Sequence, residues 1–309
     1  MISAAGQRIG WDAVPPYVRA EIERILGSPV VEARSQSGGF SPGTADRVRT
    51  REGRRAFVKA AGRSLNEKTV RLHRREVAVT RALSSRVPAP ALLGSYDDGD
   101  WVALVLEDVE GRHPRTPWDG AELTAVLGAV NALAAAPLSD EQRQYRQAGD
   151  VLAHDLAGWR RMAVDPPTGL DPWTRDHVAE LAARVDEVLP RLTGKTLLHM
   201  DIRADNLLIR PDGEVVIVDW PWAARGPAWL DPLSVLVNVN LFGGHDVEAL
   251  SAQHVRAEPG DVTGFLVGLT GYFLDAARQP GSPGLPTVRA FQAAQGRSTL
   301  AWVRRRLGC

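Results

Sequence analysis

Asp201, Asn206 and Asp219 are the residues of this chain whose types and spacing could support chemistry. Asn206 follows Asp201 by five residues, and Asp219 follows Asn206 by thirteen. Phosphoryl transfer from a nucleotide needs one aspartate that orients and deprotonates the attacking hydroxyl group. It also needs an asparagine and a second aspartate that hold Mg²⁺ on the phosphates. We therefore predict that Asp201 is a catalytic base and that Asn206 and Asp219 are magnesium ligands.

Isolated Asp and Asn residues in loops are more often turn residues that bond their own backbone. Here the following sequence favours the catalytic interpretation. Two apolar runs, residues 207–209 and 215–218, flank a turn sequence at 210–213. A hairpin of these two runs brings Asn206 and Asp219 to the same end, where their oxygens can share one hard cation.

The composition is that of an ordinary globular protein, with 44% hydrophobic and 24% charged residues in a chain of 309. A formal net charge of zero argues against general binding of nucleic acid or of anionic membranes. The first thirty residues contain no apolar segment typical of a secretion signal, and no apolar stretch is long enough to span a bilayer. The one cysteine, Cys309, excludes an intrachain disulfide. We therefore expect a cytoplasmic protein without nucleic-acid or membrane partners.

The hydrophobic patterns divide the chain into two lobes and predict an α+β fold. Residues 1–107 are expected to form a small antiparallel-sheet lobe, and residues 121–309 a larger helical lobe with the catalytic hairpin as its main strand pair. Residues 108–120 contain glycine and prolines in a polar stretch and are expected to form the connector. Strands are predicted at 30–36, 45–50, 55–59, 91–96 and 101–106. After a short helix that Gly27 ends, helices are predicted at 67–84, 121–136, 150–162, 172–189, 229–241, 247–254, 262–278 and 285–305.

Lys59 and Glu76 form a second candidate pair. Lys59 ends a predicted strand, and in the kinase arrangement such a lysine reaches the α- and β-phosphates and is held by a glutamate on the next helix. Glu76 lies on the apolar stripe that contains Leu72, Val79 and Leu83. Because a carboxylate on a buried face is costly unless it is paired, we predict an ion pair between Lys59 and Glu76. The alternative is that Lys59 reaches solvent and Glu76 pairs with a neighbouring arginine.

A glycine-rich turn lies one hairpin before the lysine strand. It contains Gly38, Gly39 and Ser41, and the backbone N–H groups of such a turn can approach phosphates closely. Glycine-rich hairpin turns are common, so the interpretation depends on the position of this turn relative to Lys59. The sequence G-x-x-x-x-G-K-[ST] of a P-loop does not occur. We predict that the three residues contact nucleotide phosphates.

Most neighbours of the predicted catalytic residues are expected to have structural roles, and the role of one, Arg203, is not decided by the sequence. His199 completes the order H-x-D-x-x-x-x-N, a signature of protein kinases, and we expect it to orient the loop backbone by hydrogen bonds. For Arg203, contact with a phosphate or substrate and a solvated or capping role remain open. Asp231 is expected to cap a helix and to brace the loop. Core or lobe packing is expected for Trp220, Trp222 and Trp229.

With these residues in place, the chain resembles the aminoglycoside phosphotransferase family, the antibiotic-kinase branch of the protein-kinase-like fold. The resemblance covers most of the chain. Residues 38–43 look like the nucleotide loop of the family, residues 56–59 like its lysine strand, residues 106–109 like its hinge, and residues 199–206, 218–220 and 229–231 like its catalytic loop, metal aspartate and following helix.

The resemblance implies a bilobal kinase-like fold and an O-phosphotransferase that uses ATP or GTP with Mg²⁺. It further implies that adenine bonds to the backbone at Glu107 and Val109, and that a small hydroxylated acceptor, with antibiotics among the candidates, binds in the helical lobe. The chain does not look like a protein kinase, because it lacks D-F-G and A-P-E. It also departs from the family in having Met200 where glycine is usual, and in an acceptor region that is not conspicuously acidic.

Two other functions remain open for a chain with these motifs. One is nucleotidyl transfer on the same fold. The other is a nucleotide-binding regulator with weak or lost catalysis. The complete set of candidate catalytic residues argues against a regulator, and Met200 is the one feature in its favour.

Overall fold

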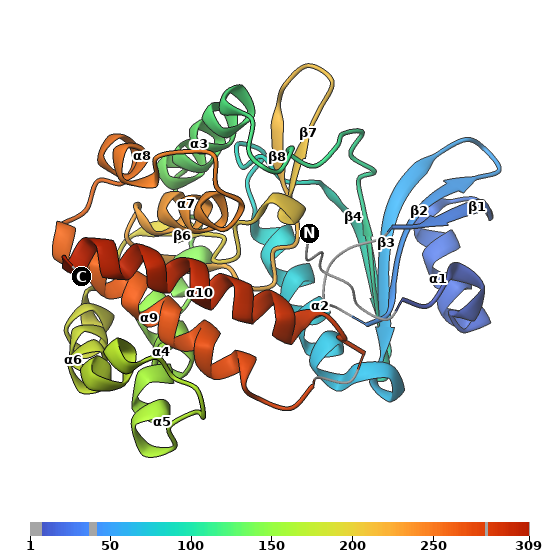
Figure 1. The fold of residues 1–309 in the computed structure, drawn as a ribbon. Coiled ribbons are helices and arrows are strands. Elements are labelled where there is room, and N and C mark those ends of the chain that lie inside the picture. The colour runs from blue at the N-terminus through green and yellow to red at the C-terminus, as the bar shows by residue number, and fades with distance from the viewer. Residues whose placement is uncertain (1–7, 37–41, 282–283, 309) are drawn as a thin grey trace.

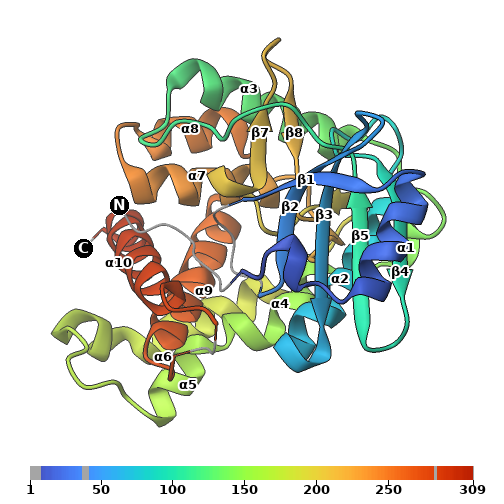
Figure 2. The same cartoon turned by 90° about the vertical axis from the view of Figure 1, so that its right-hand side faces the viewer.

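The N-terminal lobe is built on a five-stranded antiparallel sheet with the strand order β1-β2-β3-β5-β4. The computed structural model describes residues 8–36, 42–281 and 284–308. Figure 1 shows the sheet with α1 and α2 on one side of the molecule and the other labelled helices on the opposite side. Figure 2 shows the five strands side by side. The strands are β1 (Val30–Ser35), β2 (Thr44–Thr50), β3 (Arg55–Gly62), β4 (Leu92–Asp97) and β5 (Trp101–Leu106), close to their predicted positions.

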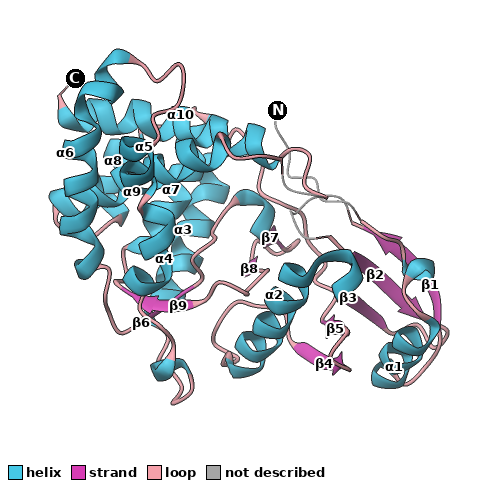
Figure 3. Ribbon diagram, turned by 90° about the horizontal axis from the view of Figure 1, so that it is seen from below, coloured by secondary structure: helices cyan, strands magenta, loops and turns pink. Residues whose placement is uncertain are grey.

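Different helices cover the two faces of this sheet (Figure 3). All six residues of β5 are buried. Alternate residues of the strand lie in two apolar clusters: Ala103 packs with α1 (Pro16–Leu26), whereas Leu104 packs with α2 (Arg63–Ala82). Because successive side chains of a strand point to opposite faces, a strand covered on both sides is apolar along its whole length. The predicted antiparallel sheet lobe is confirmed.

Helix α2 contains a kink at the point where the sequence predicted its start. Asn66 has non-helical backbone angles (φ −170°, ψ 111°), and its Oδ1 accepts a hydrogen bond of 2.9 Å from the N–H of Thr69. Asn66 therefore caps the long helical segment that begins at Glu67. Residues 63–65 add a turn before the cap, which the apolar pattern does not indicate.

The larger lobe is helical, and one of its predicted helices is divided in two. The pattern at 150–162 predicted a single helix, but α4 ends at Leu156 and α5 begins at Gly158. A Cβ atom at Gly158 would lie 2.2 Å from the carbonyl oxygen of Gly271, so this bend lets the chain approach the α9 backbone closely. The helices are α3 (Gly120–Ala135), α4 (Ala148–Leu156), α5 (Gly158–Val164), α6 (Pro172–Val188), α7 (Leu230–Phe242), α8 (Val247–His254), α9 (Pro259–Ala277) and α10 (Val288–Leu307).

Two short strand pairs lie within the helical lobe. The predicted hairpin is present as β7 (Leu207–Ile209) paired with β8 (Val215–Ile217). A second pair, β6 (Thr196–Leu198) with β9 (Ala224–Gly226), was not predicted, because three-residue strands give almost no periodic signal. The loop at residues 199–206 connects β6 to β7, so both pairs hold its ends.

The chain between the lobes, residues 107–119, forms neither a helix nor one of the named strands. Arg112 makes two backbone hydrogen bonds with Ile209, which ties this segment to β7. None of the helices in the described ranges is both long and apolar enough to cross a membrane.

Candidate active site

The loop at residues 199–206 holds Asp201 in a network built on His199. The ring of His199 is fully buried, and its Nε2–H donates to the carbonyl oxygen of Val218 (3.0 Å) while its Nδ1 accepts from the N–H of Asp201 (3.2 Å). Trp220 packs edge-on against the ring. Burial lowers the pKa of His199 to about 4, so the ring is neutral and both of its nitrogens are used. The expected hydrogen bonds of His199 to the loop backbone are therefore present.

Asp231 braces the same loop from α7. Its two carboxylate oxygens accept hydrogen bonds from the backbone N–H groups of His199 (2.6 Å) and Met200 (3.0 Å). The predicted bracing contact is confirmed. The predicted helix cap is wrong, because Asp231 lies inside the first turn of α7 and Trp229 occupies the N-cap position. A carboxylate that points back to the loop is not available to the N–H groups of its own helix.

Met200 adopts a backbone conformation that favours glycine. Its φ of 73° is left-handed, as is the φ of 69° at Asp219. A side chain at such a position makes the backbone less favourable than glycine would. The departure from the family pattern at Met200 thus leaves the loop in a strained conformation, which the hydrogen bond from the Met200 N–H to Asp231 helps to hold.

Asp201 is surrounded by donors within its own loop. Arg203 donates from Nη1 to both of its carboxylate oxygens (2.8 and 3.1 Å), and Asn206 Nδ2 donates to its Oδ2 (3.1 Å). Arg203 also pairs with Asp205 (2.9 Å) and lies over the ring of Phe291. Burial raises the pKa of Asp201 to about 7, against the opposing effect of Arg203. Asp201 can therefore exchange a proton near neutral pH.

Asn206 and Asp219 lie at the same end of the hairpin. The N–H of Val218 donates to the carbonyl oxygen of Asn206 (2.9 Å), which sets the two chains side by side. The Oδ1 of Asn206 and the Oδ2 of Asp219 accept no hydrogen bond from any described residue. Two free hard oxygens fit Mg²⁺, which commonly takes one or two protein ligands and completes its shell with phosphate oxygens and water.

Lys59 joins the two lobes through its ammonium group. Its Nζ donates to both carboxylate oxygens of Glu76 (2.7 and 2.9 Å) and to Oδ1 of Asp219 (2.6 Å). The predicted contact with Glu76, which is 2% exposed, is present. Although burial opposes its charge, the two carboxylates raise the pKa of Lys59, and Lys59 in turn lowers the pKa of Asp219. Lys59 and Asp219 are therefore both ionised.

The segment after β5 leaves a backbone acceptor and a backbone donor free two residues apart. The N–H of Glu107 bonds to the carbonyl oxygen of Ala91 (2.8 Å), but the C=O of Glu107 and the N–H of Val109 have no partner among the described residues. An acceptor and a donor two residues apart match the edge of a nucleotide base. Gly38, Gly39 and Ser41 lie outside the described residues. Gly43, which follows them, has φ +126°, and a Cβ there would lie 2.5 Å from the oxygen of Ala60.

A cleft of about 700 Å³ opens between the lobes. Asp201 and Asp219 line it together with residues of α2, α4, α7, α9 and α10.

Packing was predicted for three tryptophans and is confirmed for Trp220 and Trp229, which are buried. It is wrong for Trp222, which is 37% exposed and lines the cleft. Tyr272 and Gln295 also line the cleft and were not predicted, because their positions within helices give no signal of what they face.

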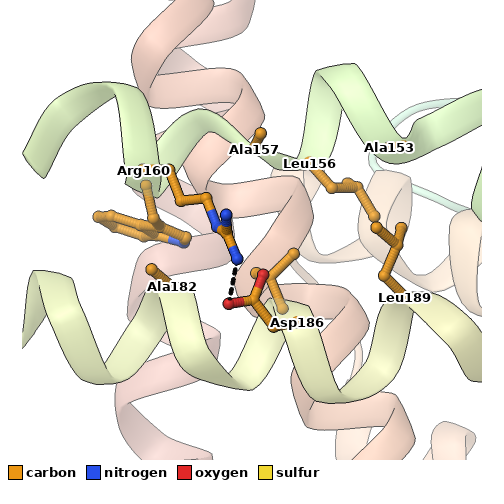
Figure 4. Close-up of a pocket in the computed structure, with 9 residues that line it drawn as sticks. Ala153, Leu156, Ala157, Arg160, Ala182, Asp186 and Leu189 are labelled. Carbon is orange, nitrogen blue, oxygen red and sulfur yellow. Dashed lines mark ion pairs between the residues drawn. The ribbon is translucent and has the colours of Figure 1, made fainter. Parts of the chain in front are cut away.

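A second cavity, of about 200 Å³, lies between α4, α5 and α6 (Figure 4). Arg160 and Asp186 point toward each other across it and form an ion pair of 2.6 Å. Its remaining lining is mostly aliphatic, and it shares only Leu156 with the large cleft among the described residues. The candidate chemistry therefore belongs to the large cleft.

Comparison with known proteins identifies the family of this architecture. The model of the phosphotransferase enzyme family matches residues 36–263. No curated protein matches the sequence. Among solved structures, choline kinase LicA from Streptococcus pneumoniae is 12% identical with a TM-score of 0.61, and the match covers 94% of this chain and 98% of that one.

Two antibiotic phosphotransferases have a similar fold. A spectinomycin phosphotransferase in complex with ADP and spectinomycin is 11% identical, with a TM-score of 0.61 and coverage of 93% of this chain and 95% of that one. A thermostable mutant of an aminoglycoside phosphotransferase, in a ternary complex with ADP and hygromycin B, is 17% identical with a TM-score of 0.59 and coverage of 93% and 98%. At these identities the likeness concerns the fold, and it confirms the predicted bilobal, protein-kinase-like α+β architecture.

Proposed function

The chain belongs to the phosphotransferase enzyme family, and we propose that it transfers the terminal phosphoryl group of ATP or GTP to a hydroxyl group of a small molecule. The observation that carries this proposal is the contact of Lys59 with both Glu76 and Asp219, because Asp219 lines the same cleft as Asp201. A cation for phosphates, a free carboxylate oxygen for a metal and a base are thus close together, as phosphoryl transfer requires. The similar structures with ADP and an antibiotic support a nucleotide donor and a small acceptor.

The nucleotide would lie against the sheet lobe. Lys59, held by Glu76, offers a fixed positive charge for the α- and β-phosphates. The free C=O of Glu107 and N–H of Val109 would bond the base. Gly38, Gly39 and Ser41, in the glycine-rich sequence before Lys59, stay candidates for phosphate contacts.

Asn206 and Asp219 would hold Mg²⁺ through their free oxygens. The bound ion would neutralise charge on the phosphates. Asp219 would then share its carboxylate between the ion and Lys59, which is the group that now bonds its Oδ1. This arrangement couples the position of the metal to the position of Lys59.

Asp201 would accept the proton of the acceptor hydroxyl as its oxygen forms a bond to the γ-phosphorus. The bond from that phosphorus to the β–γ bridging oxygen breaks, and the nucleoside diphosphate leaves with the electron pair. Arg203 and Asn206 fix the carboxylate in place through their hydrogen bonds. A pKa of about 7 suits a group that takes up a proton at neutral pH.

The direct test is product mass after incubation with ATP, Mg²⁺ and a panel of hydroxylated compounds that includes antibiotics. The proposal expects a product heavier by one phosphate and an equal amount of ADP. A product heavier by a nucleoside monophosphate would show nucleotidyl transfer instead. A regulator would be favoured if the protein bound ATP tightly but formed no more product from any compound than the Asp201→Asn variant does.

A further inference from the structure

The wall of the large cleft in the helical lobe is mainly apolar and aromatic. Leu152 of α4, Leu269 and Phe273 of α9 and Phe291 of α10 line it, and Tyr272 lies among them. Helices α9 and α10, which carry most of these residues, pack along each other (Figure 1). Pockets of several hundred cubic ångströms with such walls bind small molecules mainly through apolar contacts, with a few polar groups that fix orientation. The wall therefore favours an acceptor with a substantial apolar body.

The charges around the cleft do not favour a polycation. Three carboxylates line it, Asp155, Asp201 and Asp219, and so do three cations: Lys68, Arg203 and Arg289. Asp201 is paired with Arg203, and Asp219 is paired with Lys59. Of the three carboxylates, only Asp155 has no ion pair or side-chain hydrogen bond with a described residue. At most one cationic group of an acceptor would meet a free carboxylate here.

Gln295 of α10 has a polar atom that the protein leaves without a partner. The residue is 2% exposed, and its Oε1 is enclosed and accepts no hydrogen bond from the described residues. It also lines the cleft. Gln292, one turn earlier, contrasts with it because its Oε1 accepts a hydrogen bond from Arg289 (2.9 Å). Buried polar atoms nearly always have a hydrogen-bond partner, so the lone acceptor at Gln295 calls for one.

We infer that the acceptor is a hydroxylated molecule with an apolar ring body and no more than one cationic group, and that the Gln295 side chain, which lines the cleft, turns its Oε1 toward a donor on that body and accepts a hydrogen bond from it. The inference rests on the proposed function for the identity of the cleft as the acceptor site. It assigns Gln295 to substrate binding and not to the packing of α10.

The assignment of Gln295 is tested first by stability, because that test needs neither nucleotide nor acceptor. Gln295→Met keeps the length of the side chain and removes an acceptor that is unpaired in the free protein, so Tm should rise. The matched control is Gln292→Met on the same helix. It removes a hydrogen bond that exists, the one from Arg289, so Tm should fall. A Tm for Gln295→Met at or below that of the wild type would overturn the assignment, whatever the outcome for the proposed function.

The acceptor class is tested by comparing two sets of hydroxylated compounds in the ATP and Mg²⁺ assay. Erythromycin, lincomycin and chloramphenicol have an apolar body and at most one basic amine, whereas kanamycin, neomycin and hygromycin B carry several. We expect kcat/KM for the best of the first set to exceed that for the best of the second by at least about tenfold, the lower range for discrimination by an apolar pocket. Equal or better use of the polycations would overturn the inference and would leave the proposed function standing.

Gln295→Met links the two tests. With the best acceptor of the first set, KM should rise about two- to tenfold at little change in kcat, as expected for loss of one hydrogen bond made equally in the ground and transition states. The KM for ATP should stay the same, because Gln295 lies on α10 in the helical lobe. An unchanged acceptor KM would remove Gln295 from substrate binding.

Discussion

The two walls of the cleft differ in how their polar groups are satisfied. On the side assigned to the nucleotide, Lys59 bonds three carboxylate oxygens of Glu76 and Asp219 within 2.9 Å. On the side assigned to the acceptor, Gln295 leaves its enclosed Oε1 without a partner among the described residues, and Asp155 makes no ion pair there. A side that meets the same phosphates in every turnover can hold its cation in place in advance, and it leaves free the groups proposed to meet the metal and the nucleotide base. A wall that selects a ligand leaves part of its hydrogen bonding for that ligand to complete.

Asp201→Asn should give the largest effect and should separate the two walls most clearly. We expect the phosphorylation rate to fall by at least about 10²-fold, the lower range for a positioned base, because the amide cannot take the proton. The Kd for ATP should stay within about twofold, since Asp201 makes its hydrogen bonds inside its own loop. Single-turnover kinetics and calorimetry measure the two quantities. Near wild-type turnover would rule out Asp201 as the base.

The pH profile sharpens the same assignment. Because burial raises the pKa of Asp201 to about 7, the carboxylate is protonated and inactive as a base below that pH. kcat/KM should therefore rise about tenfold per pH unit up to about pH 7 and level off above it. Arg203 lowers the pKa of Asp201, so Arg203→Gln should move the limb to higher pH. A limb that stays in place in this variant would assign the titration to another group.

The raised pKa of Asp201 has the opposite effect on folding stability, which should fall as the pH rises. The folded pKa of Asp201 lies above the value of about 3.9 in an unfolded chain, so its protonated form favours the folded state. This contribution is fully present below about pH 4 and is lost as the pH rises through about 7. At neutral pH the loop thus holds a carboxylate whose ionisation opposes folding and would be required of the proposed base.

The residues of the nucleotide side could be predicted because their signals are local. Glu76 was found from one helical stripe and Lys59 from the end of one strand, and their contact follows from the cost of an unpaired buried carboxylate. Asn206 and Asp219 were found from one hairpin. The acceptor side has no such signal. Gln295, Tyr272 and Asp155 come from three helices, and only the packing of those helices brings them together.

Two wrong predictions, the single helix at 150–162 and the helix cap at Asp231, also arise from tertiary contacts that the local sequence does not show. The pattern at 150–162 is continuous, and only the approach of Gly158 to Gly271 in α9 explains the break in the helix. Asp231 has the type of a helix cap, but the buried N–H groups of the loop take its two oxygens. In both cases a tertiary contact outweighs a local preference. The sheet lobe escapes such errors because its hairpin turns and alternating strands are set by neighbouring residues.

Asp219→Ala tests the metal ligand on the nucleotide side. We expect Mg²⁺-dependent ATP affinity to fall by more than about tenfold, because the variant loses a carboxylate ligand of the ion. Asn206→Ala is the matched variant. It should lose less ATP affinity, because a carboxylate binds a hard dication better than an amide does. Calorimetric titration with ATP, with and without Mg²⁺, measures both losses. Equal affinity of Asp219→Ala and wild type in the presence of Mg²⁺ would contradict the assignment.

The Lys59–Glu76 pair is tested by a double-mutant cycle on kcat/KM with Lys59→Ala and Glu76→Gln. Each change disables the same unit, so the effects should not add, and the coupling should be about 0.5–3 kcal/mol. Glu76→Gln should reduce the rate more than the stability, because the amide keeps the shape and removes the charge that fixes Lys59. Strict additivity would mean that the observed contact has no part in catalysis.

The smallest expected effect concerns Met200, which lies between the two walls. Its left-handed φ of 73° disfavours any side chain, while the side chain itself packs against the core of the helical lobe. Met200→Gly loses that packing but can adopt the left-handed φ without steric cost. Met200→Ala loses most of the packing and keeps the steric cost of a Cβ atom. The difference in stability between the two variants therefore measures the cost of the left-handed φ. We expect the glycine variant to be more stable than the alanine variant by about 1 kcal/mol in chemical denaturation, the reverse of their order in a regular helix. If alanine proved the more stable, the loop would relax without cost in the variants, and the strain assigned to Met200 would be absent.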